Sequence, residues 1–198
     1  MKQKIEQLQA ILDQGKRILF FTGAGVSTDS GIPDFRSADG LYSGAYAYPP
    51  ETILSHTFFL KNTAEFYHFY REKMLPGNAR PNAVHLFIAE MEKSGRSFGV
   101  VTQNIDGLHQ KAGSKNVYEL HGSVFRNYCT RCHAFYGIDT IKNTDGIPYC
   151  SKCGGIIKPD VVLYEESLDN DTIAGAVAAI RAADTLIIGG TSLIVYPA

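Results

Sequence analysis

The stretch RILFFTGAGVSTDSGIPDFR, residues 17–36, decides the fold. Its apolar run ILFFT is typical of a buried strand and ends directly at Gly23. Gly23 and Gly25, coming straight after a strand, indicate a turn whose backbone amides can hold a phosphate group. The dinucleotide fingerprint G-x-G-x-x-G lacks its third glycine, because Thr28 stands in that position. Asp34-Phe35-Arg36 then follows on a segment that we expect to be a loop.

Three further apolar runs resemble this one, and each ends in small or polar residues. They are FGVVT before Gln103, VYEL before His121 and TLIIGG before Thr191. Helical periodicity lies between the runs, for example over residues 63–75 and 81–94. This alternation predicts an α/β fold, a Rossmann-like parallel sheet with helices on both faces. Ligands of such sheets bind at the carboxyl ends of the strands, where the polar clusters lie.

The composition limits the possible functions. A formal net charge of -1, with 44% hydrophobic and 20% charged residues, indicates a globular protein and argues against a general nucleic-acid binder. No apolar run reaches the roughly 18 residues that a membrane span needs. The N-terminal segment lacks the apolar centre of a signal peptide, so we expect a cytoplasmic protein without a membrane partner. It is predicted to be an amphipathic helix, with one face formed by Ile5, Leu8, Ile11 and Leu12.

All four cysteines lie in two CxxC pairs, Cys129/Cys132 and Cys150/Cys153. The interval between the pairs, residues 133–149, falls in the range of zinc ribbons, in which four thiolates hold one Zn²⁺ ion. A four-thiolate site is closed, so the zinc is expected to be structural. Disulfides are the alternative, which a reducing compartment disfavours. The ribbon also mixes basic and aromatic residues, which can bind single-stranded nucleic acid but more often pack a small domain.

Polar residues that follow the strands are the candidate reactive groups. Asn104 and Asp106 can cap the helix after their strand or contact a ligand, and the two roles are not exclusive. His121 stands at a strand end, where a general base can face a ligand. Thr191 and Ser192 form a second pocket of backbone amides and hydroxyls after the last apolar run. The remaining histidines are interpreted as structural, namely His56, His68, His85, His109 and His133.

In this order, GAGVST, GIPDFR, TQNIDGLH, ELHG, the two CxxC pairs and GTSLIVYPA resemble the sirtuin family over the whole chain. The resemblance implies an NAD-dependent protein-lysine deacetylase with a Rossmann domain, a small zinc-ribbon domain and a substrate cleft between them. It implies NAD as co-substrate, structural zinc, and an acetyl-lysine-containing protein or peptide as partner. The expected products are nicotinamide, O-acetyl-ADP-ribose and free lysine.

The resemblance also implies a role for each matching residue. The cofactor would be bound by Gly23, Ala24, Gly25 and Thr28 at the diphosphate, by Phe35, Arg36 and Gln103 at the reacting ribose, by Asn104, Ile105 and Asp106 at nicotinamide, and by Thr191 and Ser192. His121 would be the base that acts on a ribose hydroxyl, with Asn104 and Asp106 as further catalytic residues. The substrate would lie against Val161, Val162, Leu163 and Tyr164, with the acyl pocket near Tyr67 and Tyr70.

Three departures from the family pattern change the expectations. Tyr164-Glu165-Glu166 stands where Phe-Gly-Glu is usual, so Glu165 lacks the glycine's freedom to reach positive φ and adds negative charge beside the peptide groove. Arg71 comes one position late for the Tyr-x-x-Arg pair of members that remove acidic acyl groups. One helical residue is a turn of about 100°, so Arg71 should face elsewhere and neutral acyl groups are expected. The ending at 196–198 leads us to expect a chain truncated at its C-terminus.

The expected organisation has three parts. Residues 1–36, 95–123 and 159–198 form a Rossmann-like NAD-binding domain, 37–94 a cofactor loop with a helical insertion, and 124–158 the zinc-ribbon module. Two other functions stay open, a protein ADP-ribosyltransferase that cleaves the same bond, and a non-catalytic zinc-ribbon or NAD-binding fragment. The intact set of Asn104, Asp106 and His121 favours catalysis over binding alone.

Overall fold

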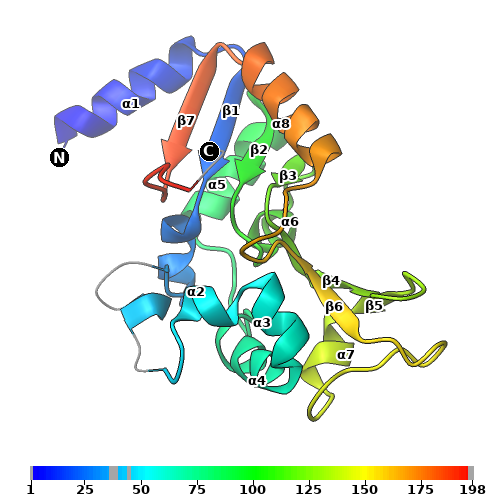
Figure 1. Cartoon of the computed structure of the whole chain (residues 1–198). Coiled ribbons are helices and arrows are strands. Elements are labelled where there is room, and N and C mark those ends of the chain that lie inside the picture. The colour runs from blue at the N-terminus through cyan, green and yellow to red at the C-terminus, as the bar shows by residue number, and fades with distance from the viewer. Residues whose placement is uncertain (1, 36–39, 44–45, 196–198) are drawn as a thin grey trace.

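The computed structural model describes residues 2–35, 40–43 and 46–195. The chain forms an upper lobe around a parallel sheet and a lower lobe of short helices and a small antiparallel sheet (Figure 1). Among the described residues, no helix combines the length and the apolar character that a membrane crossing requires.

Four parallel strands build the upper sheet in the order β3-β2-β1-β7. In chain order they are β1 (Ile18–Thr22), β2 (Ser97–Thr102), β3 (Val117–Glu119) and β7 (Thr185–Gly189). They are the four apolar runs of the sequence, so the predicted parallel sheet is confirmed. β1 lies inside the sheet with all five residues buried, and its side chains alternate between the two faces.

Helices cover both faces of this sheet, as predicted. On the face of Ile18 and Phe20, helix α5 (Ala83–Lys93) packs through Ile88 and Met91. On the opposite face, helix α8 (Asn170–Ala182) packs small alanines against the strands (Figure 1). The small side chains let α8 lie close to the sheet. Both faces of β1 are thus covered by helices and shielded from solvent. The sheet is therefore a firm base for the turns at its carboxyl edge.

The N-terminal helix α1 (Lys2–Gln14) is amphipathic, but only its last turn is packed. Leu12 is buried with the sheet cluster, whereas the side chains of Ile5, Leu8 and Ile11 are 62%, 45% and 50% exposed. Figure 1 shows this helix projecting from the upper lobe. The predicted apolar face thus exists, and most of it faces solvent in this chain.

The helical part of the lower lobe is α2 (Pro50–Ile53), α3 (His56–Lys61) and α4 (Thr63–Lys73). An aromatic cluster forms its core, with the rings of Phe59, Phe66, Tyr67 and Tyr70 fully buried. A short 3-10 turn, η2 (Leu41–Ser43), and α2 both lie in the segment 37–94, which the sequence predicted to hold a cofactor loop and a helical insertion. Pro50 in the first turn of α2 favours that helix start, because its ring presets the helical φ.

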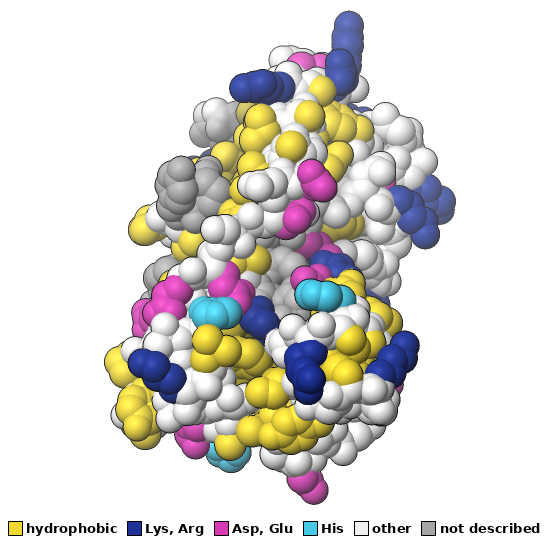
Figure 2. Space-filling model, turned by 45° about the vertical axis from the view of Figure 1, so that its right-hand side comes forward, with side chains coloured by type: hydrophobic (Ala, Val, Ile, Leu, Met, Phe, Trp, Pro, Cys, Tyr) yellow, Lys and Arg dark blue, Asp and Glu magenta, His cyan; other side chains and the backbone are white. Residues whose placement is uncertain are grey.

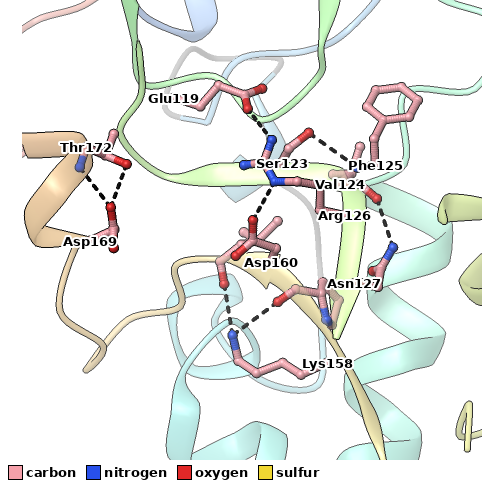
Figure 3. Close-up of polar contacts among 12 residues, drawn as sticks. Glu119, Ser123, Val124, Phe125, Arg126, Asn127, Lys158, Asp160, Asp169 and Thr172 are labelled. Carbon is pink, nitrogen blue, oxygen red and sulfur yellow. Dashed lines mark hydrogen bonds and ion pairs between the residues drawn. The ribbon is translucent and has the colours of Figure 1, made fainter. Parts of the chain in front are cut away.

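The remaining part is an antiparallel sheet in the order β5-β4-β6, with a short helix α7 (Ile138–Lys142) beside it. Its strands are β4 (Gly122–Cys129), β5 (Phe135–Gly137) and β6 (Ile157–Val161). Arg126 on β4 joins this sheet to the upper lobe (Figure 3). Its guanidinium lies 2.6 Å from Glu119 Oε2 at the end of β3 and 2.7 Å from Asp160 Oδ2 on β6. These ion pairs flank the residues that connect β3 to β4.

Candidate active site

Two glycine turns meet at the carboxyl edge of the parallel sheet. β1 leads into the 3-10 helix η1 (Ala24–Ser30), where the Gly25 N–H donates to the carbonyl of Gly190 over 2.9 Å. A Cβ at Gly25 would come within 2.9 Å of the Gly190 Cα atom, so the two backbones touch. Thr191 is fixed beside them because its hydroxyl donates to Gln103 Oε1 over 2.7 Å.

The two pockets that the sequence predicted separately therefore form one cradle. Gly23, Ala24 and Gly25 lie along its wall from β1 and η1, and Thr28 donates its hydroxyl to the Gly25 carbonyl over 3.0 Å. Ser192 is exposed next to Thr191. A cradle lined by backbone rather than side chains fits a pyrophosphate group, which needs close approach to N–H donors.

A buried hydrogen-bond cluster lies behind the cradle. The Asn104 amide donates to Ser27 Oγ over 3.0 Å, and the Ser27 hydroxyl donates to Asp106 Oδ2 over 2.7 Å. The other oxygen of Asp106 accepts the N–H of Leu108 over 2.9 Å at the start of helix α6 (Leu108–Ala112). Asp106 thus caps the helix with one oxygen and joins the buried cluster with the other.

Ser27 was missing from the predicted site, although it is 1% exposed and lies between Asn104 and Asp106. The available signal was its place in GAGVS, directly after buried Val26. A hydroxyl in a 3-10 turn has no periodicity from which its direction can be read, so only the structure reveals its partners.

His121 connects β3 to β4, and its ring is held by one backbone group. Its Nδ1 lies 2.9 Å from the carbonyl oxygen of Gln103, which can only accept, so Nδ1 carries the proton. Nε2 is then the basic nitrogen. Burial lowers the pKa of His121, although the bond to Gln103 opposes the shift. The ring is therefore neutral at pH 7 and suited to accept a proton.

The predicted cofactor loop folds back on itself. The N–H groups of Leu41 and Tyr42 donate to the carbonyls of Asp34 and Phe35 over 2.7 and 2.9 Å. The Phe35 ring meets the Tyr42 ring edge-on, with centroids 5.6 Å apart. Arg36 lies outside the described residues. Ile105 is half-buried, as expected for a side chain that packs beside a pocket.

The predicted substrate segment lies beside His121. The Val162 N–H donates to the His121 carbonyl over 3.0 Å, so the segment continues the pairing of β6 with β4. Val161 and Leu163 are buried, whereas Tyr164 is exposed. Tyr164 exchanges backbone hydrogen bonds with the chain at Leu54 and His56, over 2.9 and 3.0 Å. The segment is thus held on both sides, between the antiparallel sheet and the helical part.

Glu165 corrects one expectation about backbone freedom. It adopts a φ of 74°, the left-handed region that the sequence analysis took to be closed to it. Its carboxylate accepts the Thr57 N–H over 2.9 Å in the first turn of α3. The glycine-like conformation is therefore kept, and the added negative charge lies at a helix N-terminus, where the helix dipole favours it.

Tyr67 and Tyr70 lie in the core of the lower lobe, each 0% exposed. Burial raises the pKa of both hydroxyls, and Tyr67 donates its hydroxyl to the Ile157 carbonyl. They share an apolar cluster with Val161 and Leu163. Arg71 Nε donates to a carbonyl of α7, that of Ile141, over 2.8 Å, and that Arg71 faces away from the acyl pocket stays a prediction.

The four cysteines come together as the spacing predicted. Their sulfur atoms all lie within 4.8 Å of one another. A tetrahedral Zn²⁺ with bonds of about 2.3 Å needs sulfurs about 3.8 Å apart, so the set fits one ion. The Tyr136 hydroxyl donates to Cys150 Sγ over 3.1 Å and lowers the pKa of that thiol to about 6. This contact favours the thiolate that a metal requires.

The surface is hollowed at the waist between the lobes, and histidine, acidic and basic side chains gather around the hollow (Figure 2). Lys and Arg side chains are spread over this face rather than joined in one patch. Arg126 pairs with Glu119 and Asp160 (Figure 3). Lys158 Nζ lies 2.9 Å from Glu166 Oε2. These basic groups are neutralised internally, which disfavours a track for a nucleic-acid backbone.

Comparison with protein families and curated proteins gives one consistent result. The Sir2 family model matches residues 23–197. An NAD-dependent protein deacetylase of Clostridium perfringens (strain 13 / Type A) is 56% identical over 200 residues, covering 100% of this chain and 82% of the relative. Another of Clostridium acetobutylicum is 58% identical, covering 98% of this chain and 81% of the relative.

Solved structures match over nearly the whole chain. A Sir2 complex with p53 peptide and NAD+ is 39% identical with a TM-score of 0.86, covering 98% of this chain and 78% of that one. A Sir2 structure with a deacetylated p53 peptide and 3'-O-acetyl ADP-ribose has 39% identity, a TM-score of 0.89 and the same coverage. Sir2Tm bound to a propionylated peptide has 37% identity and a TM-score of 0.85, again covering 98% and 78%.

Proposed function

This chain belongs to the Sir2 family, and we propose that it removes acetyl groups from protein lysines in an NAD-dependent reaction. The products are nicotinamide, O-acetyl-ADP-ribose and free lysine. The observation that carries the proposal is the orientation of His121. Its Nδ1 is tied to the Gln103 carbonyl, so its basic Nε2 is left to act beside the cluster of Asn104, Ser27 and Asp106.

His121 is the general base. NAD, when bound, supplies the ribose carbon that loses nicotinamide and the hydroxyl that receives the acetyl group. The Nε2 atom of His121 takes the proton from that hydroxyl. The hydrogen bond from Nδ1–H to the Gln103 carbonyl keeps the ring oriented and stabilises the imidazolium as it forms.

Asn104 and Asp106 bind the carboxamide of nicotinamide. Both are 8% exposed, so their polar atoms act in a dry pocket in which hydrogen bonds are strong. A carboxylate oxygen accepts more than one hydrogen bond, so Asp106 can bind the amide N–H while it holds Ser27. Ser27 fixes the spacing of the two side chains. Ile105 supplies an apolar wall of this pocket, and Phe35 covers the reacting ribose.

The acetyl-lysine peptide lies along residues 161–164, and its acyl group is neutral. Arg71, on the same helix as the buried tyrosines of α4, donates to a carbonyl of α7 and lies over the Tyr67 ring at 5.3 Å. It is therefore not placed to pair with an acidic acyl group. Acetyl and succinyl forms of one peptide test this directly, and faster removal of succinyl would contradict it.

The zinc is structural, and we propose for the chain the division that the sequence predicts. Residues 124–158 form the zinc-ribbon module, and 37–94 carry the cofactor loop and helical insertion, with α5 packed on the parallel sheet. The Rossmann-like domain takes residues 1–36, 95–123 and 159–198. Four thiolates close the metal site, so the ion stabilises the module and takes no part in the reaction.

Mass spectrometry of peptide and small molecules tests the reaction. The purified chain is incubated with an acetyl-lysine peptide, with and without NAD. We expect loss of acetyl only with NAD, matched by nicotinamide and O-acetyl-ADP-ribose. The His121→Ala variant should lose roughly 100- to 10,000-fold in turnover. His68→Ala is the matched control, because the His68 side chain is 75% exposed and outside the site.

Turnover of His121→Ala at the wild-type rate would remove this histidine from the mechanism. The same spectra separate the two other functions. An ADP-ribosyltransferase would leave a protein or peptide heavier by ADP-ribose, with the acetyl group still present. A binding protein would leave both substrates unchanged.

A further inference from the structure

Two buried histidines lie next to each other behind the proposed site. His85 on α5 is 0% exposed and His109 on α6 is 1% exposed, and their ring centroids are 4.8 Å apart. Among the described residues, His85 Nε2 and His109 Nδ1 have no hydrogen-bond partner. Buried polar atoms without partners are uncommon in native proteins, so this facing pair needs an explanation.

The proton on His109 is located by its contact with Thr22. His109 Nε2 lies 2.9 Å from the Thr22 hydroxyl. That hydroxyl donates its only hydrogen to Thr102 Oγ1, also over 2.9 Å. The Thr22 oxygen must therefore accept from His109, which places the proton on Nε2 and leaves Nδ1 as a bare acceptor.

The proton on His85 is located by the start of α5. The backbone N–H of Asn82 donates to His85 Nδ1 over 3.3 Å, as part of the capping box. Asn82 Oδ1 lies 3.1 Å from the same nitrogen, but it already accepts the N–H of Val84 over 3.0 Å. A proton on His85 Nδ1 would point at the Asn82 N–H, so two donors would face each other. It would also leave His85 Nε2 and His109 Nδ1 as two unprotonated acceptors between the rings. The proton therefore belongs on Nε2, where it faces His109.

We propose that His85 Nε2–H donates to His109 Nδ1, and that His109 is a positioning residue for the turn that carries Asn104. The link completes one chain of hydrogen bonds that all run in the same direction, from the Asn82 backbone through both rings and Thr22 to Thr102. The proposal requires a rotation of one or both rings, whose centroids are 4.8 Å apart, to bring the two nitrogens into contact. The catalytic role of this series of hydrogen bonds rests on the proposed function. The existence of the hydrogen bonds does not depend on it.

The two ends of this series of hydrogen bonds, at Thr102 and at Asn82, both contact the walls of the site. At one end, Thr102 Oγ1 accepts the backbone N–H of Asn104 over 3.1 Å. At the other, the Asn82 side-chain amide donates to the Val26 carbonyl over 2.7 Å and to Ser30 Oγ over 3.0 Å, both in η1. The two histidines thus tie the Asn104 turn to the wall that holds Ser27.

The surroundings of the rings keep them neutral, as an N–H···N bond requires. Burial lowers the pKa of His109 to about 3, and the neighbouring His85 ring adds to that shift. Burial also lowers the pKa of His85, against an opposing effect of the Asp106 charge. Neither ring is therefore charged at pH 7, and neither is part of the proton transfer assigned to His121.

The first test reads the tautomers directly and requires no activity. Long-range ¹H–¹⁵N spectra of the ¹⁵N-labelled chain at pH 7, assigned with His85→Gln and His109→Gln, show which ring nitrogens carry protons. We expect the Nε2–H form for both residues and a scalar coupling between His85 Nε2 and His109 Nδ1 across the hydrogen bond. An Nδ1–H form of His85, a charged ring, or absence of the coupling overturns the link.

The second test asks whether the hydrogen bonds through His85 and His109 position the turn that carries Asn104. His85→Phe removes the donor at similar volume, whereas His85→Gln keeps an N–H near the Nε2 position. We expect His85→Phe to raise the KM for NAD and the inhibition constant for nicotinamide about tenfold, as leaving one buried acceptor unpaired predicts. His85→Gln should stay within about threefold of the wild type on the same reasoning.

A purely structural role would lower the melting temperature of both variants and leave these two constants unchanged, which would overturn positioning. Equal losses in the Phe and Gln variants would do the same. If His85→Phe does not fold, the kinetic constants of His85→Gln and the tautomer spectra still test the proposal. A wild-type chain without turnover contradicts the proposed function alone, because the tautomers are measured independently.

Discussion

The hydroxyl groups of Tyr42 and Tyr164 lie 2.6 Å apart, and they join the predicted cofactor loop to the substrate segment. Tyr42 also packs its ring against Phe35, which we place over the reacting ribose. The hydroxyl of Tyr164 is the atom that a Phe, the usual family residue, would lack. In this chain the two proposed substrate sites are therefore linked by a contact that a Phe at this position could not make.

Replacing Tyr164 by Phe should loosen the cofactor loop and leave the peptide groove in place. One exposed hydrogen bond contributes about 0.5–1.5 kcal/mol, so the KM for NAD should rise about two- to tenfold. Steady-state kinetics with each substrate varied in turn measures this. Tyr42→Phe should have the same effect, and the double variant should add nothing. A change in the KM for the peptide alone would contradict the linkage.

Glu165 offers a test of backbone strain against helix capping. Glu165→Ala keeps the left-handed backbone and loses the carboxylate that accepts the Thr57 N–H, whereas Glu165→Gly loses the carboxylate but adopts positive φ freely. The Gly variant should therefore be more stable than the Ala variant by about 1 kcal/mol. Urea unfolding of both variants gives the difference. Equal stabilities would mean that this φ carries no strain.

Gly122 follows His121 at φ 76°, and a Cβ there would overlap the carbonyl oxygen of Asp160. Gly146 has nearly the same φ, 77°, but nothing within 4 Å of its Cβ position. Gly146→Ala should cost about 1 kcal/mol, whereas Gly122→Ala should cost more than about 3 kcal/mol and lower turnover by displacing His121. Thermal unfolding and deacetylation rates measure both. A tolerant Gly122→Ala would show that β4 can shift from β6 without harm.

Buried His109 makes stability depend on pH. Its pKa is about 3 in the folded chain, below the ordinary 6.5, because burial disfavours the charged ring. Between these values the unfolded chain binds a proton that the folded chain refuses, so stability is full above pH 6.5 and falls with acid. The expected slope is about 1.4 kcal/mol per pH unit. The exposed control His68→Gln should keep this slope, whereas His109→Gln should reduce it.

Denaturant unfolding of the three proteins between pH 4 and pH 7.5 gives these slopes. Loss of zinc in acid affects the three alike, so the difference between slopes isolates the ring. Identical slopes for the wild type and His109→Gln would mean that the ring is protonated without cost in the folded chain.

The sheet and the clustering of the candidate residues at its edge could be predicted because their signals are local. Each strand of the parallel sheet is a short apolar run, since the strands at its centre are buried on both faces. Asn104, Asp106 and His121 come directly after such runs, where the topology brings strand ends together. Spacing alone also placed the four cysteines around one point.

Other features depend on partners distant in the sequence and could not be predicted. The role of Ser27 requires Asn104 and Asp106 to meet in space. The positive φ of Glu165 goes with a hydrogen bond that the distant Thr57 N–H donates to its carboxylate, which no local propensity reveals. The burial of Tyr67 and Tyr70 follows from docking of α4 against β6, through the Ile157 carbonyl. Periodicity likewise marked the apolar face of α1 without showing that most of it stays exposed.

The contact between Gly25 and Gly190 orders events during synthesis on the ribosome. Gly25 leaves the exit tunnel early, and β1 then lacks both β7 and the turn that closes the cradle. The cradle cannot form until Gly190 has also emerged and β7 has docked, so a nascent chain cannot hold a dinucleotide there before that point. The zinc module emerges earlier and draws its ligands from one short span, so it can bind its ion first. Metal loading can therefore precede cofactor competence in each new molecule.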